Sequence, residues 1–463
     1  MGFNKSFSDT GGYTDQCSIY TWAEIDAYKI KRNYRIFRQH VSPTICAAVL
    51  KADAYRMGAC EVGEVLFQAG CRHFFVAYVD EADALAKHLL EHCCAVPSYD
   101  NITEFSTDNR PVAKVSNFEE FLGAHEAQNR SVRDDSSIGA TLKLPKERSF
   151  RNRSNDSACT SAPLQKYKLF VLDGPFIGAW CLKMASAGYT PVLNTIENVC
   201  EWNGYAAATN NRLPAILHID TGLRRLGIPY SDINAFERID ASWIEWEFFM
   251  SHFVASSDVN HAANAIQISR VANIREKFPD IPFSLADTDG VLLGRHVFFD
   301  MVRVGVGLYG FEEYLPGVEC CITVYGKILQ IQDIAPGTGV GYNWHFVSDK
   351  NMRIATVSCG YADGVTPSLL ATQNIPGGSG GIGPVDCFII NGQEAPIIWR
   401  NSMDLTTVDI TNIDAVRVGD EAVILGHPIQ LKNAQAAGIA FHRRLVSLSS
   451  RVRRIFVNGA PHG

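Results

Sequence analysis

The chain has 463 residues, 46% of them hydrophobic and 20% charged, which is typical of an ordinary folded protein of about two or three domains. Its net charge of −7 at pH 7 argues against a nucleic-acid partner, and no apolar run approaches the ~20 residues of a membrane span. The 13 cysteines contain no CxxC pair of the kind that binds zinc, so we expect no metal site. Because no signal peptide is visible, we expect a cytoplasmic protein with reduced thiols.

Strand-like and helix-like patterns alternate through the first two thirds of the chain, after a polar, Gly-rich stretch over 1–16 that we expect to be a flexible leader. This alternation predicts a parallel α/β fold, and its length of about 300 residues indicates an (α/β)8 TIM-type barrel over 17–311. The predicted strands are Ser18–Asp26, Ile45–Leu50, His73–Tyr78, Lys168–Gly174, Pro191–Thr195, the start of Ala215–Gly227, Trp246–Phe253, Phe283–Thr288 and Met301–Gly305. The predicted helices are Ala27–Arg38, Glu61–Ala69, Glu81–Glu91 and Ile177–Ala187.

The alternation is interrupted at about 96–166, a stretch rich in Asn, Ser, Asp and Arg. An irregular stretch of this length is uncommon inside a compact domain, so we predict an insertion that is largely disordered or loosely packed. Its basic cluster, Lys143–Arg153, is balanced by acidic residues nearby and is better explained as a solvated charge run than as a nucleic-acid site.

After Phe311 the predicted strands become short and are separated by Gly, Pro and Asn-Gly turns. This pattern of short strands and turns predicts a C-terminal all-β domain over 312–463, in which Asn391-Gly392 marks a hairpin. The sequence Gly305–Gly310 satisfies GxGxxG, but it runs into FEEYLPG instead of opening a helix, which argues against a dinucleotide-binding domain. A glycine turn that offers backbone amides to a phosphate is still compatible with it.

The segment TICAAVLKADAYRMG places Lys51 at the end of an apolar strand. If a helix begins near Lys51, the four-residue spacing brings Tyr55 to the same side, at the strand end where parallel α/β folds place their chemistry. A lysine whose pKa is lowered by burial can bond covalently to a carbonyl cofactor. Taken alone, however, such a lysine is more often a surface or ion-paired residue.

The stretch AAVLKADAYRMG closely resembles the pyridoxal phosphate lysine motif of alanine racemases, and further motifs follow in the order of that family. The resemblance implies a barrel followed by a β domain, pyridoxal 5'-phosphate as cofactor, and a small amino acid as substrate. It assigns Lys51 as the cofactor-holding lysine and one catalytic base, and Arg225 in HIDTGLRRLG as a contact of the substrate carboxylate. The other implied cofactor contacts are Tyr55, His252, Thr288, Arg303, Gly305 and Val306.

Arg303 has the clearest mechanistic meaning among the implied contacts, because it would face the pyridine nitrogen. An arginine stays protonated and can only donate, so that nitrogen would stay unprotonated and the ring would be a weaker electron sink than with a carboxylate partner. Such a ring suits simple removal and return of a proton.

The resemblance places a second acid–base residue, Tyr342, in GTGVGYNWHF of the β domain. Racemisation needs a proton donor and an acceptor on opposite faces of a planar centre, which a lysine and a tyrosine provide. A phenol needs a cationic neighbour to act as a base near neutral pH, and Arg303 and His252 are the candidates. In the family this tyrosine comes from the other subunit, which implies a homodimer with composite sites. Met403 would bind the substrate carboxylate through its backbone amide.

The sequence departs from the family pattern at several positions. His218 lies where some members have a modified lysine that orients the arginine, so Arg225 must be held differently. Ser450 lies where some members have a tyrosine beside the phosphate, and Val365 lies in a stretch that follows GYADG where many members have an arginine. These departures bear on rate and substrate range more than on the class of reaction.

The resemblance therefore predicts interconversion of L-alanine and D-alanine by a two-base mechanism, supplying D-alanine for peptidoglycan. Two alternatives stay open at this point, a racemase of broader specificity and a non-catalytic protein that binds pyridoxal phosphate. Proteins of the second kind resemble the barrel alone, so the β domain argues against it.

Overall fold

The computed structural model describes residues 20–93, 167–311, 314–365, 387–436 and 440–458. The predicted leader over 1–16 and the predicted insertion over 96–166 lie outside these residues. The chain forms two compact units. One, which we call the barrel unit, contains Phe37–Lys51 and Leu66–Gly305; the other, which we call the strand-rich unit, contains Met1–Ile36, Ala52–Val65 and Val306–Gly463. No described helix is both long enough and apolar enough to cross a membrane.

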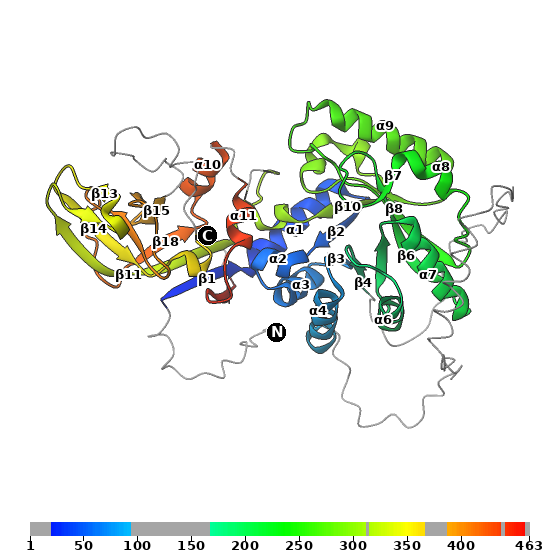
Figure 1. Ribbon diagram of the computed structural model, residues 1–463, viewed down its shortest axis with the longest axis horizontal. Helices are drawn as coiled ribbons and strands as arrows, with labels where there is room; N and C mark the ends of the chain where they lie inside the picture. The colour runs from blue at the N-terminus through cyan, green and yellow to red at the C-terminus, as the bar shows by residue number, and fades with distance from the viewer. Residues whose placement is uncertain (1–19, 94–166, 312–313, 366–386, 437–439, 459–463) are drawn as a thin grey trace, which may run out of the picture. The chain divides into compact units, whose positions relative to one another are not determined.

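The barrel unit is built on parallel strands in the order β10-β2-β3-β4-β5-β6-β8-β9, with the short β7 beside β6 (Figure 1). Backbone hydrogen bonds from Asp300 to Phe283 and from Arg303 to Ala286 link the two ends of this order, so the ring is nearly closed. The bounds are β2 Ile45–Val49, β3 His73–Val76, β4 Lys168–Val171, β5 Thr190–Leu193, β6 Leu213–Asp220, β7 Ile228–Pro229, β8 Ile244–Met250, β9 Phe283–Ser284 and β10 Met301–Val304. The predicted barrel is thus confirmed.

The inside of the ring is filled by apolar side chains contributed by successive strands. They are Ala47, Phe75, Phe170, Val192, Ile216, Phe248, Met250 and Met301. Because this core fills the barrel, polar side chains gather at the carboxyl ends of the strands, where the loops begin. Helices connect the strands, and Figure 1 shows several of them around the outside. The helices that lie within the barrel unit are α4 Val79–His92, α6 Ala179–Ala187, α7 Ile196–Ala208, α8 Ile233–Phe236 and α9 Ala262–Lys277. Three further helices have residues in both units: α1 Ala27–Val41, α2 Lys51–Arg56 and α3 Ala59–Gln68.

The strand-rich unit contains a sheet with the order β16-β15-β18-β11-β1-β19, and β14 and β17 extend from β11. Its strands are β1 Thr21–Asp26, β11 Ile322–Ile334, β14 Met352–Val357, β15 Cys387–Ile390, β16 Gln393–Pro396, β17 Thr406–Asp409, β18 Glu421–Leu425 and β19 Arg453–Val457, and a separate pair consists of β12 Gly339–Val340 and β13 Phe346–Val347. The predicted hairpin is confirmed: Asn391 and Gly392, with φ of 49° and 76°, join β15 to β16.

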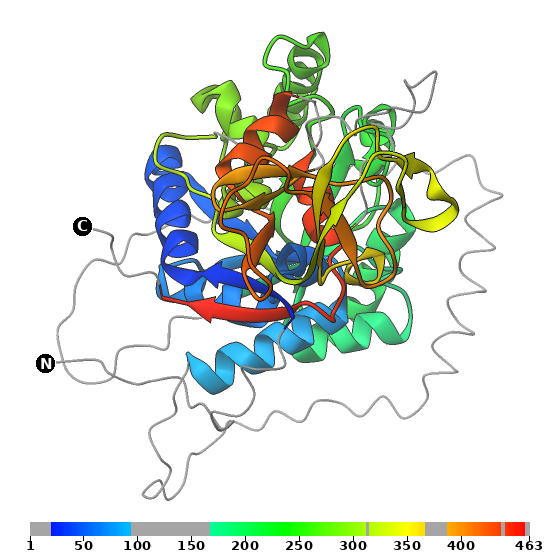
Figure 2. The same ribbon diagram turned by 90° about the vertical axis from the view of Figure 1, so that its left-hand side faces the viewer.

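The strand predicted near the N-terminus forms β1, and it belongs to the sheet of the strand-rich unit. It pairs with β11 in the antiparallel sense and with β19 in the parallel sense, and Figure 2 shows β1 and β19 side by side in blue and red. Its sequence, TWAEID, mixes buried residues with the partly exposed Thr21, Glu24 and Asp26, as expected for a sheet with one more solvated face. The barrel strand β2, ICAAV, is instead apolar throughout.

Helices α10 Pro428–Ala436 and α11 Phe441–Val446 follow β18 and were not predicted. The GxGxxG sequence after β10 leads into a short 3-10 turn, Val306–Tyr309, and not into an α-helix. This is consistent with the expectation that it does not open a dinucleotide-binding helix.

Candidate active site

Lys51 directly follows β2 and is half-buried at the carboxyl end of the barrel strands. Burial lowers the pKa of its amine, and the positive charges of Arg225 and Arg303 lower it further, while Asp173 and Glu81 oppose the shift. A lowered pKa increases the fraction of neutral amine, which is the form that attacks a carbonyl group. The barrel thus shifts Lys51 toward the form that covalent attachment of a carbonyl cofactor requires.

The turn after Lys51 is helical but left-handed, so the condition that an ordinary helix begins near Lys51 is not met. Ala52, Asp53, Ala54 and Tyr55 have φ of 55°, 55°, 52° and 58°, and Arg56 has φ of 69°. This conformation costs an L-residue about 1–2 kcal/mol, because its Cβ approaches the following carbonyl oxygen. Strain of this kind persists only where the surrounding structure enforces it, and it concentrates at functional sites.

Asp53 ties this left-handed turn to two other elements of the strand-rich unit. Its Oδ1 accepts a hydrogen bond of 2.8 Å from the backbone N–H of Ala59, the first residue of α3. Its Oδ2 accepts from Nη1 of Arg454 in β19 at 2.8 Å, and its carbonyl accepts from the N–H of Gly58 at 3.0 Å. Asp53 therefore contributes to holding the strained turn in place.

We expect replacement of Asp53 by alanine to lower the free energy of unfolding by about 1–2 kcal/mol, the usual cost of losing a capping side chain. Asp53→Asn should cost less than half of this, because asparagine keeps an acceptor for Ala59 and tolerates a left-handed conformation. Urea unfolding of both variants measures the difference. Equal losses in the two variants would show that the ion pair with Arg454, and not the capping oxygen, holds the turn.

Arg303 lies in β10 and is almost completely buried, with 5% of its surface exposed. It donates to Oγ of Ser284 at 2.5 Å and to the carbonyl oxygens of Ser251 at 2.7 Å and Leu285 at 3.3 Å. Burial lowers the pKa of Arg303 to about 10, and the negative charge of Asp287 opposes this shift. The guanidinium group thus stays positively charged at neutral pH and is oriented by fixed acceptors.

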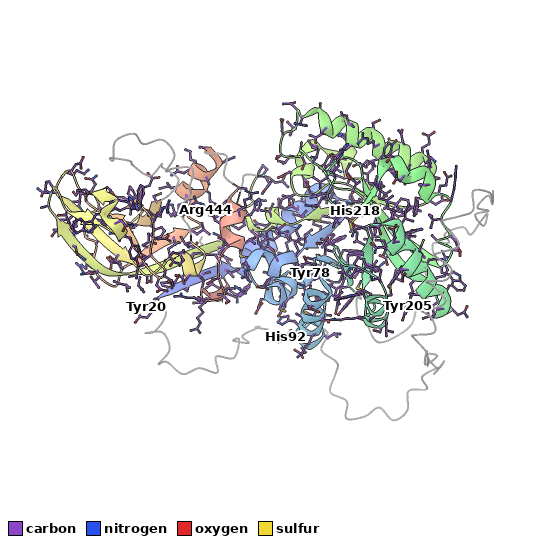
Figure 3. All side chains as sticks on the ribbon, in the orientation of Figure 1. Tyr20, Tyr78, His92, Tyr205, His218 and Arg444 are labelled. Atoms are coloured by element: carbon purple, nitrogen blue, oxygen red, sulfur yellow. The ribbon has the colours of Figure 1, made fainter. Side chains whose placement is uncertain are left out.

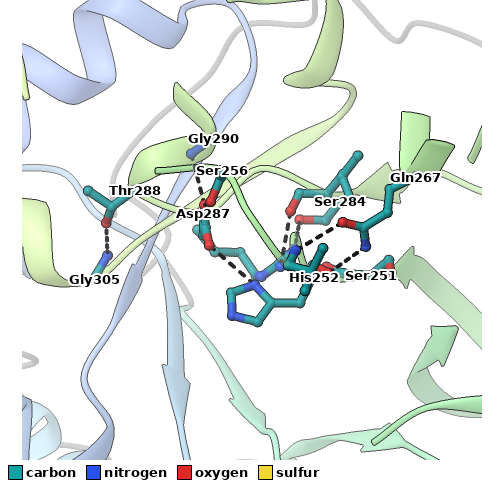
Figure 4. A network of polar contacts seen from close by, with 12 residues as sticks. Ser251, His252, Ser256, Gln267, Ser284, Asp287, Thr288, Gly290 and Gly305 are labelled. Carbon is teal, nitrogen blue, oxygen red and sulfur yellow. Dashed lines mark hydrogen bonds and ion pairs between the residues drawn. The ribbon is translucent and has the colours of Figure 1, made fainter. Parts of the chain in front are cut away.

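His252 follows β8, and Figure 4 shows its imidazole beside the carboxylate of Asp287. Its Nδ1 lies 3.4 Å from Oδ2 of Asp287, a separation longer than a hydrogen bond. Burial lowers the pKa of His252 to about 4, although Asp287 raises it, because Arg303, Arg225 and Lys51 add to the effect of burial. His252 is therefore mainly neutral near neutral pH, which argues against its predicted role as a cationic neighbour of Tyr342.

Thr288 and Gly305, two of the predicted cofactor contacts, are brought together at the ends of β9 and β10. The backbone N–H of Gly305 donates to Oγ1 of Thr288 at 3.0 Å, as drawn in Figure 4. Thr288 is 4% exposed, so this hydroxyl–amide pair forms a buried polar group at the rim of the barrel.

His218, near the end of β6, is buried among the barrel strands (Figure 3). Its Nδ1 lies 2.7 Å from Oδ1 of Asn194, whose amide nitrogen donates to the carbonyl oxygens of Leu172 and Val192. Because those two bonds identify the amide oxygen, Nδ1 must carry the proton. Burial lowers the pKa of His218 to about 3, with Arg303 adding to the effect, so the ring is neutral and its Nε2 is an acceptor.

The predicted residues of the C-terminal part are exposed on the strand-rich unit. Tyr342, in the turn between β12 and β13, is 75% exposed, and Met403 is 53% exposed. The turn of Tyr342 has left-handed residues at Asn343 and Trp344, with φ of 58° and 50°. The loop of Met403 is anchored, because its carbonyl accepts from the N–H of Ala362 at 2.9 Å.

The structure thus divides the predicted site residues between the two units. The barrel unit contains Lys51, Arg225, His252, Thr288, Arg303 and Gly305. The strand-rich unit contains Tyr55, Val306, Tyr342 and Met403. The sequence analysis missed Asp287, Asn194 and Asp53. Asn194 and Asp287 lie near the carboxyl ends of the predicted strands Pro191–Thr195 and Phe283–Thr288, and that position was the local signal that could have identified them.

Comparison with known proteins matches both parts of the chain. The model of the alanine racemase N-terminal domain matches residues 25–313, and that of the alanine racemase C-terminal domain matches residues 321–456. An alanine racemase of Rickettsia felis is 28% identical to this chain, and the match covers 94% of this chain and 98% of the relative. A catabolic alanine racemase of Rhizobium johnstonii is 29% identical, and the match covers 93% of each chain. A crystal structure of alanine racemase from Bartonella henselae, described as having covalently bound pyridoxal phosphate, has a TM-score of 0.71 and 26% identity, covering 95% of this chain and 100% of its own.

Proposed function

Because the chain belongs to the alanine racemase family, a family of isomerases, we propose that it interconverts L-alanine and D-alanine with pyridoxal 5'-phosphate as cofactor. The observation that carries this proposal is the state of Lys51, a half-buried amine with a lowered pKa at the carboxyl end of the barrel strands. The covalently bound pyridoxal phosphate of the Bartonella henselae relative supports the choice of cofactor.

The residues of the barrel unit fit this cofactor by the chemistry of their donors. Lys51 supplies a nucleophilic amine for the aldehyde, and Arg303 supplies a permanent donor for a ring nitrogen. Nδ1 of His252 is buried and has no hydrogen-bond partner among the described residues, so this ring can still adjust when a flat group packs against it. Thr288 and Gly305 of this unit are proposed phosphate contacts, as are Tyr55 and Val306, which belong to the strand-rich unit.

When bound, the cofactor supplies an electron-withdrawing ring that makes the Cα proton of the amino acid acidic. We propose that Nζ of Lys51 removes or returns this proton on one face and that the phenol oxygen of Tyr342 does so on the other. Arg225 and the backbone amide of Met403 hold the substrate carboxylate. Arg303 donates to the ring nitrogen without protonating it, which favours return of the proton over side reactions.

The exposed side chains of the strand-rich unit support a composite site in a homodimer. The exposed fractions are 75% for Tyr342, 71% for Trp344, 48% for Tyr361 and 53% for Met403, which is high for large side chains with apolar surface. We propose that a second copy of the chain covers them, so that each Tyr342 serves the barrel of its partner. In a cytoplasmic enzyme of this kind, the product D-alanine would supply peptidoglycan synthesis.

His218 suggests how Arg225 is held without a modified lysine. The loop that carries Arg225 packs on the His218 ring, since a Cβ at Gly227 would lie 3.1 Å from its Cγ. We propose that the unprotonated Nε2 of His218 accepts a hydrogen bond from the Arg225 guanidinium. Asn194 orients the ring for this by accepting from Nδ1.

Two substitutions of His218 separate its two ring nitrogens. His218→Gln places an acceptor near the position of Nε2, and we expect its KM for alanine to stay within about threefold of wild type. His218→Asn keeps only a donor near Nδ1, and we expect KM to rise about tenfold, the effect of one lost hydrogen bond to a charged group. Steady-state kinetics measures both, and a larger effect in the glutamine variant would refute the proposed bond to Arg225.

Chiral product analysis tests the proposed function directly. The purified protein is incubated with pyridoxal phosphate and pure L-alanine, and in a second reaction with L-serine. Formation of D-alanine, with serine much slower, is the expected result. Racemisation of both at similar rates would indicate a broad-specificity enzyme. Binding of pyridoxal phosphate without any D-amino acid would indicate a non-catalytic binding protein.

A further inference from the structure

Asp287 has an unusual place in the network of Figure 4, because its two carboxylate oxygens have different partners. Oδ1 accepts from the backbone N–H of Gly290 at 2.8 Å and from Oγ of Ser256 at 3.1 Å. Oδ2 is directed at Nδ1 of His252, 3.4 Å away. One oxygen thus anchors the carboxylate to its own loop and to the loop after β8, and the other is left to face the histidine.

The anchor is tightly built. A Cβ at Gly290 would lie 3.2 Å from Oδ1 of Asp287 and 3.1 Å from Cβ of Ala286, so a larger residue at this position would crowd the carboxylate. Ser256, which donates to the same oxygen, is 6% exposed. The direction of Oδ2 is therefore set before any ligand binds.

His252 is also fixed at its backbone, which leaves its ring as the adjustable part. Its carbonyl accepts from Nε2 of Gln267 at 2.9 Å, and Oε1 of Gln267 accepts from the N–H of Val254 at 2.9 Å. Nδ1 of His252 is buried and has no hydrogen-bond partner among the described residues. A small rotation of the ring would close the 3.4 Å separation to a hydrogen bond with Asp287.

We propose that Asp287 is a positioning residue that keeps the His252 imidazole in its Nδ1–H tautomer and in one ring orientation, and thereby sets the affinity for the cofactor. This inference rests on the proposed function for the identity of the cofactor. The lowered pKa of His252 agrees with it, because a neutral imidazole has one N–H, which a carboxylate attracts to Nδ1. Nε2 is then left as an acceptor, and the flat face of the ring is held for the cofactor.

The substitution Asp287→Asn tests this with little change of shape. The amide oxygen should stay with Gly290, because a backbone N–H needs an acceptor there. The amide NH2 then faces His252, where it favours an unprotonated Nδ1 and moves the proton to Nε2. Ser256→Ala is the matched control, because it removes a donor from Oδ1 and leaves Oδ2 facing the ring.

The first readout is independent of catalysis. In cofactor-free protein with 15N-labelled histidine, the ring nitrogens of His252, assigned by their disappearance in His252→Gln, should show the Nδ1–H tautomer in wild type and Ser256→Ala. Asp287→Asn should show the Nε2–H tautomer, with its unfolding temperature within a few degrees of wild type. An Nε2–H tautomer in the wild-type protein would overturn the proposal.

The second readout is the dissociation constant of pyridoxal phosphate, measured by its absorbance. We expect it to rise about tenfold in Asp287→Asn, the effect of one lost charge-assisted hydrogen bond, and to change little in Ser256→Ala. An unchanged constant in Asp287→Asn, with the tautomer inverted, would refute the link from Asp287 to the cofactor. If wild-type protein bound no pyridoxal phosphate, the proposed function would fail, whereas the tautomer would still report on the contact between Asp287 and His252.

Discussion

Lys51→Ala is expected to abolish racemisation, with kcat falling by about 10⁴-fold or more, because the same amine attaches the cofactor and moves the proton. No other group of the barrel unit among the predicted site residues combines a nucleophilic amine with this position. Chiral analysis of the product from pure L-alanine measures the loss. The visible absorption of the lysine-bound cofactor should disappear at the same time.

Two controls distinguish this loss from unfolding. Lys87→Ala removes an exposed lysine of α4 and should keep both activity and absorption. The unfolding temperature of Lys51→Ala should not fall, because removal of a partly buried cation also removes the cost of its desolvation. If D-alanine were still formed at the wild-type rate, both the assignment of Lys51 and the family's chemistry in this chain would be wrong.

Tyr342→Phe is expected to reduce racemisation by about 10³-fold, within the usual range for loss of a general acid–base group. The phenol is 75% exposed and belongs to a short turn, so its removal should change neither the unfolding temperature nor the affinity for pyridoxal phosphate. A loss of rate with unchanged cofactor binding is the signature of a group that acts on the substrate proton alone.

Proton exchange in D2O makes this prediction sharper. With Tyr342 removed, Lys51 can still exchange the Cα proton of the one enantiomer that presents it to the lysine face. We therefore expect deuterium to enter one enantiomer of alanine while conversion to the other nearly stops, and NMR follows both. Tyr28→Phe, which alters an exposed phenol of α1, is the control and should behave as wild type. Exchange into both enantiomers at equal rates would contradict the two-base assignment.

The order of the elements and the position of the reactive lysine could be predicted from local sequence. Apolar runs such as Ile45–Leu50, helical spacing and the Asn391-Gly392 turn act over a few residues, so they are readable without knowledge of the fold. The sheet to which β1 belongs was not readable in this way. Its partners, β11 and β19, lie about 300 or more residues further along the chain, and pairing at that distance leaves no mark in the local pattern.

The states of the site side chains were decided by tertiary contacts. Burial and neighbouring arginines make His218 and His252 neutral, and Asn194 selects the protonated nitrogen of His218. Asp53 holds a left-handed turn that local propensity would reject, because its partners come from α3 and β19. Motifs in the sequence thus identified the reactive groups. The protonation and tautomer of the histidines and the backbone strain after Lys51 depend instead on distant residues that only folding brings into contact.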